Sequence, residues 1–567
     1  MPARRRYFQF LLAILAVIAL ALAGWLVRGR IALSGASERH IAVLPISSLG
    51  GEPANAALAE GIQESLTSRL SNLEVGNQSL WVVPASEVQR RKVSDAAAAQ
   101  KEFGVNLVIT GSVQRDGSLL RLTVNLIDAR NLRQVGSGQF EDRTGDFSTL
   151  QDSAVAKLAN LMKIAVTPEM LHATGGAVQP AAYETYLKAR GYLQRPFTAA
   201  AFDEAIKLLG SAVQQDPKFS LAFASLGQAY LVKYQNDQDP RWLDQASANC
   251  KQALALNDQL APVYITLGGI LKATGQNDLA LEQIQRALRL EPRNADALVA
   301  EAQVFEAQGR LKESEETLRR AAALRPDYWI GYDRLALFYV HQRRFADAVK
   351  PYERVLEIMP NNAEAYNNLG TIYRNLGDRA KAAVLFEKAI SLAPGTYRFY
   401  SNLGLVRQEQ GNYGAAVQAL EKAAALNEKD YRVWMNLAQT DRRLGDTQKA
   451  AAAYAHALPL VEDMATRQPQ DAIIQAVLGR LYAALQPGGK ALPHLESALA
   501  LAPKDAFVLE IAAVGYEALG NRHMAIDCAV RAVHAGKTVQ QLGTDPWLRD
   551  VLADPGFKPS ATSSKSK

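Results

Sequence analysis

Small residues and prolines recur through much of this chain at a constant spacing of 34 residues. Six small residues keep that step: Ala280, Ser314, Ala348, Ala382, Ala416 and Ala450. Four prolines keep it as well: Pro292, Pro326, Pro360 and Pro394. A period of this length is typical of solenoids, in which each structural repeat packs mainly against its neighbours. The 567 residues, 48% of them hydrophobic, therefore predict a stacked array and not one large core.

The clearest unit runs from Ala363 to Pro394 and reads AEAYNNLGTIYRNLGDRAKAAVLFEKAISLAP. Gly370 and Ala382 are small where two antiparallel helices must approach closely, and Phe386 fills the space between neighbouring units. A proline ends the second helix. The unit resembles the tetratricopeptide repeat (TPR) at nearly every signature position. This resemblance implies a superhelix of paired α-helices.

About ten copies of the repeat are expected across residues 180–536. Two copies are longer by seven residues, one around Asn236 to Pro240 and one between Ala457 and Ala498. A capping helix is expected over residues 537–558, where it would cover the last exposed apolar face. Residues 559–567 are rich in serine and lysine and are expected to form a disordered tail.

An uncharged apolar run, FLLAILAVIALALAGWLV, occupies residues 10–27. At about 1.5 Å rise per residue, a helix of this length spans most of the roughly 30 Å hydrocarbon layer. We therefore expect one transmembrane helix between a short basic terminus, residues 1–9, and a linker, residues 28–38. A secretory signal cleaved after Ala21-Leu22-Ala23 is the alternative, but cleavage there would leave an apolar new terminus. Three arginines on each side leave the orientation open.

Short apolar runs alternate with helical segments over residues 39–170, which predicts a small α/β domain. Apolar residues spaced by four place one face of the first helix in the core, and strict alternation from Leu120 to Leu126 predicts a half-buried strand. Asp116-Gly117 favours a tight turn before that strand. The expected elements are a strand over His40–Ile46, a helix over Ala56–Leu73, a strand over Leu80–Val83, a helix over Ala85–Phe103, strands over Leu107–Val113, Leu120–Leu126 and Val135–Phe140, and a helix over Phe147–Ile164.

Three segments of this domain resemble the TolB-like amino-terminal domain of bacterial membrane sensors. They read IAVLPISSLGGEPANAALAEGIQESLTSRLS, FGVNLVITGSVQRDGSLLRLTVNLIDARN and FSTLQDSAVAKLANLM. In that family the domain commonly lies between a membrane helix and a TPR array. The resemblance implies a single-pass protein of the inner (cytoplasmic) membrane, with the bulk of the chain periplasmic or otherwise extracytoplasmic. The expected fold class is thus mainly α: a transmembrane helix, a small α/β domain and a TPR solenoid.

The TPR resemblance implies that the first helix of each repeat lines a concave groove, and the helical period then predicts that the residue before each Leu-Gly pair points inward. Three successive repeats have asparagine at this position, namely Asn368, Asn402 and Asn436. An amide both donates and accepts hydrogen bonds, so this ladder could pair with the backbone of an extended peptide. The alternative is that each asparagine bonds across to an adjacent helix of the protein itself.

Five arginines are expected on the walls of the same groove. Arg334 takes the ladder position in an earlier repeat, and Arg374 and Arg442 lie one turn beyond it. Four residues before the ladder come Arg398, Arg432 and one acidic residue, Glu364, so the walls are expected to be mostly basic. Guanidinium groups favour carboxylates, so the predicted partner is a protein or peptide that is acidic or ends in a carboxylate. Ordinary solvated charges are the alternative interpretation of these arginines.

No motif for catalysis, nucleotide binding or metal binding is present in the sequence, so we expect no enzyme, no metal site and no small-molecule cofactor. The net charge of +6 includes no long basic block, which argues against nucleic acid as a partner. We therefore expect a membrane-anchored TPR scaffold that binds a partner peptide in its groove. The alternative is the sensory half of a split signalling system, coupled through its membrane helix to a separate kinase or adenylate cyclase. A weaker alternative is an adaptor for a glycosyl transferase.

Overall fold

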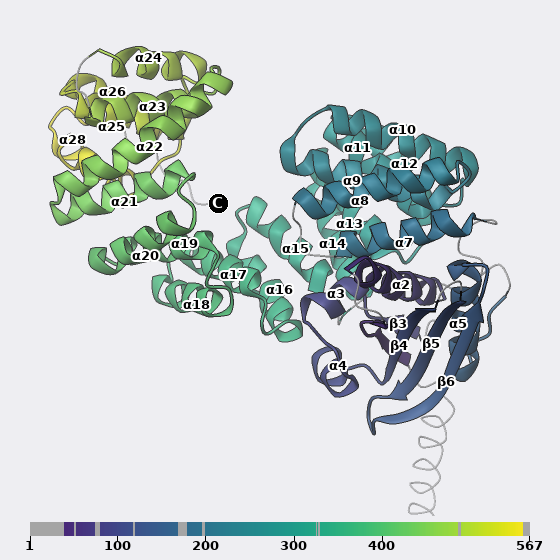
Figure 1. Cartoon of the computed structure of the whole chain (residues 1–567). Helices are drawn as coiled ribbons and strands as arrows, with labels where there is room; N and C mark the ends of the chain where they lie inside the picture. The colour runs from purple at the N-terminus through teal and green to yellow at the C-terminus, as the bar shows by residue number, and fades with distance from the viewer. Residues whose placement is uncertain are drawn as a thin grey trace, which may run out of the picture. The chain divides into compact units, whose positions relative to one another are not determined.

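Figure 1 shows the computed structural model of the chain, which divides into two compact units between Gly331 and Tyr332. The structure describes residues 39–49, 53–73, 80–116, 119–167, 178–194, 199–324, 326, 329–485 and 489–559. The predicted terminus, transmembrane helix and linker, residues 1–38, lie outside these ranges, as does the predicted tail beyond residue 559. Within the described ranges, no helix combines the length and apolar character that a membrane span requires.

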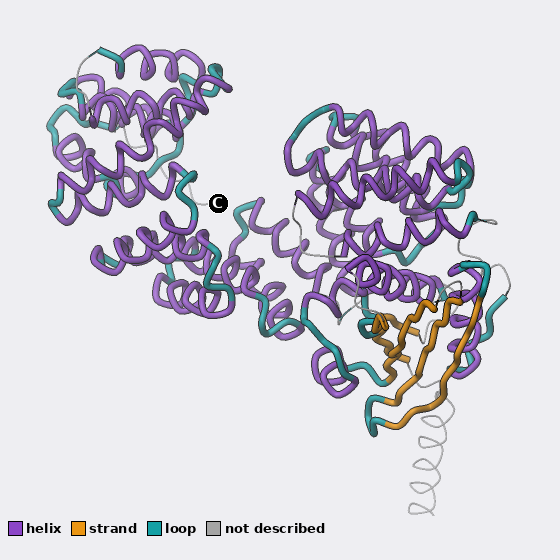
Figure 2. The backbone as a smooth tube through the Cα atoms, in the orientation of Figure 1, coloured by secondary structure: helices purple, strands orange, loops and turns teal. Residues whose placement is uncertain are grey.

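The first unit begins with a six-stranded sheet, drawn in orange in Figure 2. Its strands are β1 (Arg39–Val43), β2 (Ser47–Leu49), β3 (Leu80–Val82), β4 (Leu107–Asp116), β5 (Leu119–Asp128) and β6 (Arg133–Asp142). Strand β1 pairs in parallel with β3 and β4, and β2 also pairs in parallel with β4. Strands β4, β5 and β6 form an antiparallel meander. Buried residues alternate along β5, as the sequence pattern predicts for a half-buried strand.

Helices pack against both faces of this sheet. One core contains α2 (Pro53–Asn72) and α5 (Phe147–Leu161), and the other contains α3 (Ala85–Arg90) and α4 (Ala96–Phe103). Ile41 and Val43 of β1 belong to the core with α2, whereas Ala42 belongs to the core with α3. Neighbouring strand residues point to opposite faces, so the short apolar strand is buried on both sides.

The single helix predicted over Ala85–Phe103 is wrong, because the structure has two helices there. Helix α3 ends at Arg90, and Lys92 takes a positive φ of 52°. Asp95 then begins α4, since its side chain accepts a hydrogen bond from the backbone N–H of Ala98. An aspartate cap of this kind satisfies an otherwise unpaired backbone donor and starts a new helix.

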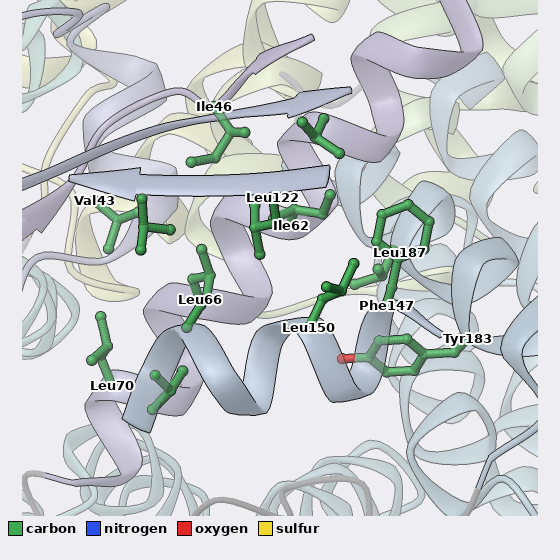
Figure 3. Close-up of a cluster of buried hydrophobic side chains, with 14 of the residues drawn as sticks. Val43, Ile46, Ile62, Leu66, Leu70, Leu122, Phe147, Leu150, Tyr183 and Leu187 are labelled. Atoms are coloured by element: carbon green, nitrogen blue, oxygen red, sulfur yellow. The ribbon is translucent and has the colours of Figure 1, made fainter. Parts of the chain in front are cut away.

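The first repeat helix, α7 (Pro180–Gln194), packs directly on α2 and shares the core of the α/β domain. Figure 3 shows Tyr183 and Leu187 of α7 beside Phe147 and Leu150 of α5. A Cβ atom at Gly61 of α2 would lie 1.8 Å from the carbonyl oxygen of Leu187, so the two helices can approach this closely only at glycine. The sheet domain and the start of the repeat array therefore form one packed body within the first unit.

The rest of the described chain is almost entirely helical, in successive antiparallel pairs (Figures 1 and 2). In the first unit the contacting pairs are α7 with α8 (Ala199–Gln215), α9 (Ser220–Asp237) with α10 (Arg241–Leu256), α11 (Ala261–Ala273) with α12 (Asn277–Leu290), and α13 (Ala295–Ala307) with α14 (Leu311–Leu324). Helices α15 (Trp329–His341) and α16 (Phe345–Ile358) follow. In the second unit the pairs are α17 (Ala363–Asn375) with α18 (Arg379–Leu392), α19 (Tyr397–Glu409) with α20 (Tyr413–Leu426), α21 (Tyr431–Leu444) with α22 (Thr447–Arg467), α23 (Ala472–Leu485) with α24 (Ala491–Leu501), and α25 (Ala506–Ala518) with α26 (Arg522–His534).

The small residues that set the 34-residue period lie at the helix contacts. All six of them, from Ala280 to Ala450, are at most 1% exposed. A Cβ atom at Gly370 would lie 2.8 Å from the ring of Phe386, which is the close approach that the sequence predicts for this pair. The two predicted seven-residue extensions are found as longer helices, 18 residues in α9 and 21 in α22, where the repeat helices flanking them have 13 to 17.

The predicted capping helix over residues 537–558 is not a single helix. The structure has α27 (Val539–Leu542), a 3-10 turn η1 (Pro546–Leu548) and α28 (Arg549–Ala553). Pro546 lacks a backbone N–H and restrains Asp545 before it to an extended conformation, so a helix cannot run through this point. Leu542, Leu548 and Val551 are nevertheless fully buried in a cluster with α25 and α26, so the segment does cover the end of the array.

Candidate functional site

The first helices of the second unit share one face, which carries the residue before each Leu-Gly or Leu-Ala pair. We call this the first-helix face; it contains Asn368, Asn402, Asn436 and Val477, on α17, α19, α21 and α23. Residues three, four and seven positions away along a helix lie on the same side. The predicted asparagine ladder and most of the predicted arginines belong to this face.

Two of the three predicted asparagines make hydrogen bonds inside the protein. The amide nitrogen of Asn368 donates to the hydroxyl of Tyr352 on α16 at 3.1 Å. The amide nitrogen of Asn402 donates to the amide oxygen of Asn367 in the preceding repeat at 2.8 Å. Asn436 is half-buried on α21. The ladder therefore ties neighbouring helices together, although each amide has a second N–H that could meet a ligand.

Three of the predicted arginines pair with nearby carboxylates. Arg398 contacts Glu364 of the preceding repeat at 2.8 Å, and Arg374 contacts Glu409 of the following one at 2.7 Å. Arg432 contacts Asp430 at 3.1 Å. Arg334 is exposed on α15. The walls beside Asn368 and Asn402 are thus less basic than the sequence predicts, because these carboxylates offset much of the positive charge.

Arg442 is the predicted arginine that contacts another segment of the chain. Its guanidinium lies 3.7 Å from the centre of the Trp547 ring, a cation–π contact with η1. The next residue, Arg443, donates hydrogen bonds to the backbone carbonyls of Thr544 and Gly543. Two neighbouring arginines of α21 therefore hold residues 543–548, a turn followed by η1, which we call the cap segment.

Asp545 is the charged residue of the cap segment. One carboxylate oxygen accepts from Arg480 of α23 at 2.8 Å and from Gln439 of α21 at 2.9 Å. The other accepts from the backbone N–H of Trp547 at 3.0 Å. Asp545 is 5% exposed and Arg480 is 6% exposed. Burial lowers the pKa of Arg480, but the charge of Asp545, together with the nearby Tyr454 and Glu510, raises it more, so the pKa of the guanidinium lies above its usual value.

The sequence predicted Arg442 at this site but missed Gln439, Arg443 and Arg480. Gln439 and Arg443 follow Asn436 by three and seven residues, so the helical period places them on the first-helix face. Arg480 stands within the apolar stretch Ala476 to Ala483, where a charged residue needs a partner. The isolated charge of Arg480 was therefore the sequence signal for a buried ion pair. Nothing in the neighbouring sequence indicates that its partner is Asp545, 65 residues away.

Reactive and metal-binding groups are sparse in the part of the chain that the structure describes. No cluster of three or more histidine, cysteine, aspartate or glutamate side chains there is arranged to hold a metal. Both cysteines, Cys250 and Cys528, are buried, and burial raises the pKa of each thiol to about 12. A thiol of such high pKa is a packing residue and a poor nucleophile.

Family models for the tetratricopeptide repeat match this chain at residues 266–328, 330–395 and 401–465. These residues are tetratricopeptide repeats. TPR domains bind protein or peptide partners. The matches include α17 with Asn368, most of α19 with Asn402, and α21 with Arg442 and Arg443.

One curated relative is "Putative adenylate cyclase 3" of Rhizobium meliloti (strain 1021), which is 27% identical over 224 residues. That stretch is 39% of this chain and 37% of the relative, so the match spans little more than a third of either protein.

Similar solved structures include two that are described as TPR proteins. A thermophilic TPR protein of Thermus thermophilus is 25% identical, with 32% of this chain and 98% of that one covered and a TM-score of 0.27. PilF of Pseudomonas aeruginosa is 22% identical, with 36% and 92% covered and a TM-score of 0.32. YrrB, described as a TPR protein with an unusual peptide-binding site, is 22% identical, with 32% and 94% covered and a TM-score of 0.27.

Proposed function

We propose that this TPR protein is a membrane-anchored scaffold that binds a peptide segment of a partner protein along the first-helix face of its second unit. The observation that supports the proposal is the way this face holds the cap segment. Arg443 donates to two successive backbone carbonyls, and Gln439 and Arg480 donate to a carboxylate. Contacts to backbone carbonyls hold a segment whatever its side chains, and contacts to a side chain select it.

The same donor chemistry continues upstream, where Asn402, Arg374 and Arg398 lie on the first-helix face. Arg398 and Glu364 have side chains 58% and 51% exposed, so their ion pair is open to solvent. Exposed pairs contribute little stability, typically under about 1 kcal/mol, so a ligand carboxylate can exchange for Glu364 at small cost. An acidic partner segment is therefore the ligand that this part of the face would accept most readily.

Anchoring through residues 10–27 is part of the proposal and rests on the sequence of that run. With the anchor in the inner membrane, the α/β domain follows within a short linker, and the TPR array extends from it. In this arrangement the α/β domain provides a second surface near the bilayer. The bulk of the chain is proposed to be periplasmic, in line with the TolB-like resemblance of residues 39–170.

Site-specific photo-crosslinking tests the binding face. A photoreactive residue replaces Arg398 on the first-helix face, and a matched one replaces Val384 on α18, whose side chain is 64% exposed. We expect a discrete partner to be captured from position 398 and not from position 384. The same proteins captured from both positions, or none from 398, would overturn the proposed face. The compartment of the captured partner also tests the proposed topology.

The second candidate is the sensory half of a split signalling system, which the similarity to a protein named as an adenylate cyclase favours. In that case residues 10–27 would pass a signal through specific contacts between membrane helices. Exchanging this run for an unrelated transmembrane helix would abolish function in a sensor. A scaffold needs only to be anchored, so it would tolerate the exchange.

A further inference from the structure

The cap segment reaches further along the array than closing its end requires. The last helix pair, α25 and α26, is already covered by the apolar side chains of Leu542, Leu548 and Val551. The polar contacts of residues 543–547 instead reach α23 and α21, which belong to the two preceding repeats. A terminal cap has no need of hydrogen bonds two repeats upstream, so these contacts need another explanation.

The receptor side of the contact carries more positive charge than the cap segment offsets. Three arginines face the cap segment: Arg442, Arg443 and Arg480. The carboxylate of Asp545 pairs with the guanidinium of Arg480. Arg442 meets only the face of an indole ring, and Arg443 meets carbonyl and hydroxyl oxygens and the Tyr413 ring. Glu510 on α25 is paired with Lys537. Such a surplus favours an anionic ligand over a neutral one.

The buried ion pair between Arg480 and Asp545 also points to recognition. Removing two charges from water offsets most of their attraction, so such a pair adds little net stability compared with apolar residues of similar size. However, a segment that places no carboxylate beside Arg480 would leave that buried charge unpaired, which makes its binding strongly unfavourable. The pair therefore selects which segment can lie here.

We propose that Gln439, Arg442, Arg443 and Arg480 form a binding site for an acidic–aromatic peptide, and that the cap segment is its resident internal occupant. The ligand has two consecutive backbone carbonyls, then aspartate, then an aromatic side chain two residues later, as in Gly543-Thr544-Asp545-Pro546-Trp547. A partner segment with this chemistry displaces the cap segment. This inference rests on the proposed function and gives it a ligand class and a means of control.

Tethering sets the strength of that control. A segment joined to its site by a short linker acts as if present at a concentration of order 1 mM. A free peptide with the same contacts must therefore compete with the tethered copy, and it binds the intact chain weakly. Removing the anchoring side chains of the tethered copy should release the site for the free peptide.

The test uses the full chain and a fluorescent peptide with the sequence of residues 541–549, QLGTDPWLR. Three chains are compared: the natural sequence, a vacated variant with Asp545→Ala and Trp547→Ala, and the same variant with Arg443→Met and Arg480→Met added. Fluorescence anisotropy should show binding to the vacated variant at least tenfold tighter than to the natural chain. The added arginine changes should abolish it. A peptide with the aspartate replaced, QLGTNPWLR, should bind the vacated variant at least tenfold more weakly.

Equal affinity for the natural and vacated chains, with circular dichroism showing both folded, would overturn the inference and leave the cap segment a structural element. A second measurement avoids variants that lose stability. Hydrogen exchange at residues 543–548 of the natural chain should speed up in excess unlabelled peptide, and unchanged exchange would also overturn it. Crosslinking from position 398 tests the proposed function separately. If the peptide measurements overturn the inference but the Arg443→Met/Arg480→Met chain still captures a partner at position 398, the proposed function stands without the inference.

Discussion

The guanidinium of Arg480 and the carboxylate of Asp545 meet at 2.8 Å although they are 65 residues apart in the chain. Both side chains are less than 10% exposed. Arg480 belongs to the first helix of a repeat, and Asp545 belongs to the segment that follows the array. This pair joins the segment that follows the array to the helix face on which the proposed function places the partner.

Breaking the pair on one side should cost more than replacing both sides. Asp545→Ala leaves Arg480 buried without its carboxylate, so we expect a loss of about 3–5 kcal/mol in the stability of the second unit. The double variant Arg480→Leu/Asp545→Leu removes both charges and should lose clearly less. Urea unfolding followed by tryptophan fluorescence measures the difference. Equal losses would mean that the side chains act by packing alone.

Asp441 should make the second unit more stable in mild acid. It is 3% exposed, and burial raises its pKa to about 6, helped by the nearby charges of Asp446 and Glu421 and opposed by Lys449. The folded protein therefore holds this proton at pH values where the unfolded chain, with a pKa near 3.8, has released it. Stability should fall as the pH rises from about 4 to 6, by up to about 3 kcal/mol.

Asp441→Asn tests that assignment, because it removes the titration and keeps the shape. Its gain in stability over the natural chain should be larger at pH 7.5 than at pH 4, where the natural carboxyl is already neutral in the folded state. Thermal melts at the two pH values provide the comparison. A gain that does not depend on pH would assign the pH dependence to other groups.

Gly61→Ala should disrupt the first unit. The new Cβ atom would lie 1.8 Å from the carbonyl oxygen of Leu187, so α2 and α7 would have to move apart, at a cost of at least about 2 kcal/mol. Gly210→Ala on α8 is the matched control, since no heavy atom lies within 4 Å of its Cβ position. There alanine should gain about 0.5–1 kcal/mol through helix propensity. Denaturant midpoints of the two variants should shift in opposite directions.

Asn402→Ala should reduce stability as well as any binding. Its amide donates to Asn367, which is 7% exposed, so the substitution leaves a buried acceptor and should cost about 1 kcal/mol. Arg398→Ala on the same helix removes only an exposed ion pair and should cost less than about 0.5 kcal/mol. A double-mutant cycle with Asn367→Ala isolates the amide contact. A coupling energy near zero would mean that the contact between Asn402 and Asn367 adds no stability, which would leave the Asn402 amide available to a ligand.

Repeated local patterns made much of the architecture predictable. The 34-residue period predicts a small residue at the position that Ala382 takes in its unit, and it predicts the close contact of Gly370 with Phe386. Both were predictable because equivalent helix contacts recur along the array. In the α/β domain, alternation predicted β5 and short apolar runs predicted β1, β3 and β4, whereas the short strand β2 was not predicted. The break between α3 and α4 was missed because the strong helix formers around it masked the cap at Asp95.

The candidate site was only partly predictable for a related reason. The helical period identified the face that carries Asn402 and Arg442, since it depends only on residues a few positions apart. It did not reveal that Asn402 bonds to Asn367, nor that Arg398 would pair with Glu364 and Arg374 with Glu409. Those contacts depend on the angle between successive repeats, which no single repeat contains.

The sequence by itself determined that residues 266–465 fold as TPR helices and which face of each helix is buried, because these properties arise from spacings of a few residues repeated along the chain. Only the tertiary structure decided that Gly61 meets Leu187 and that Arg480 meets Asp545. These residues are far apart in the chain, and their contact depends on the path of the whole backbone between them. Periodicity identifies a surface, whereas the fold decides what lies against it.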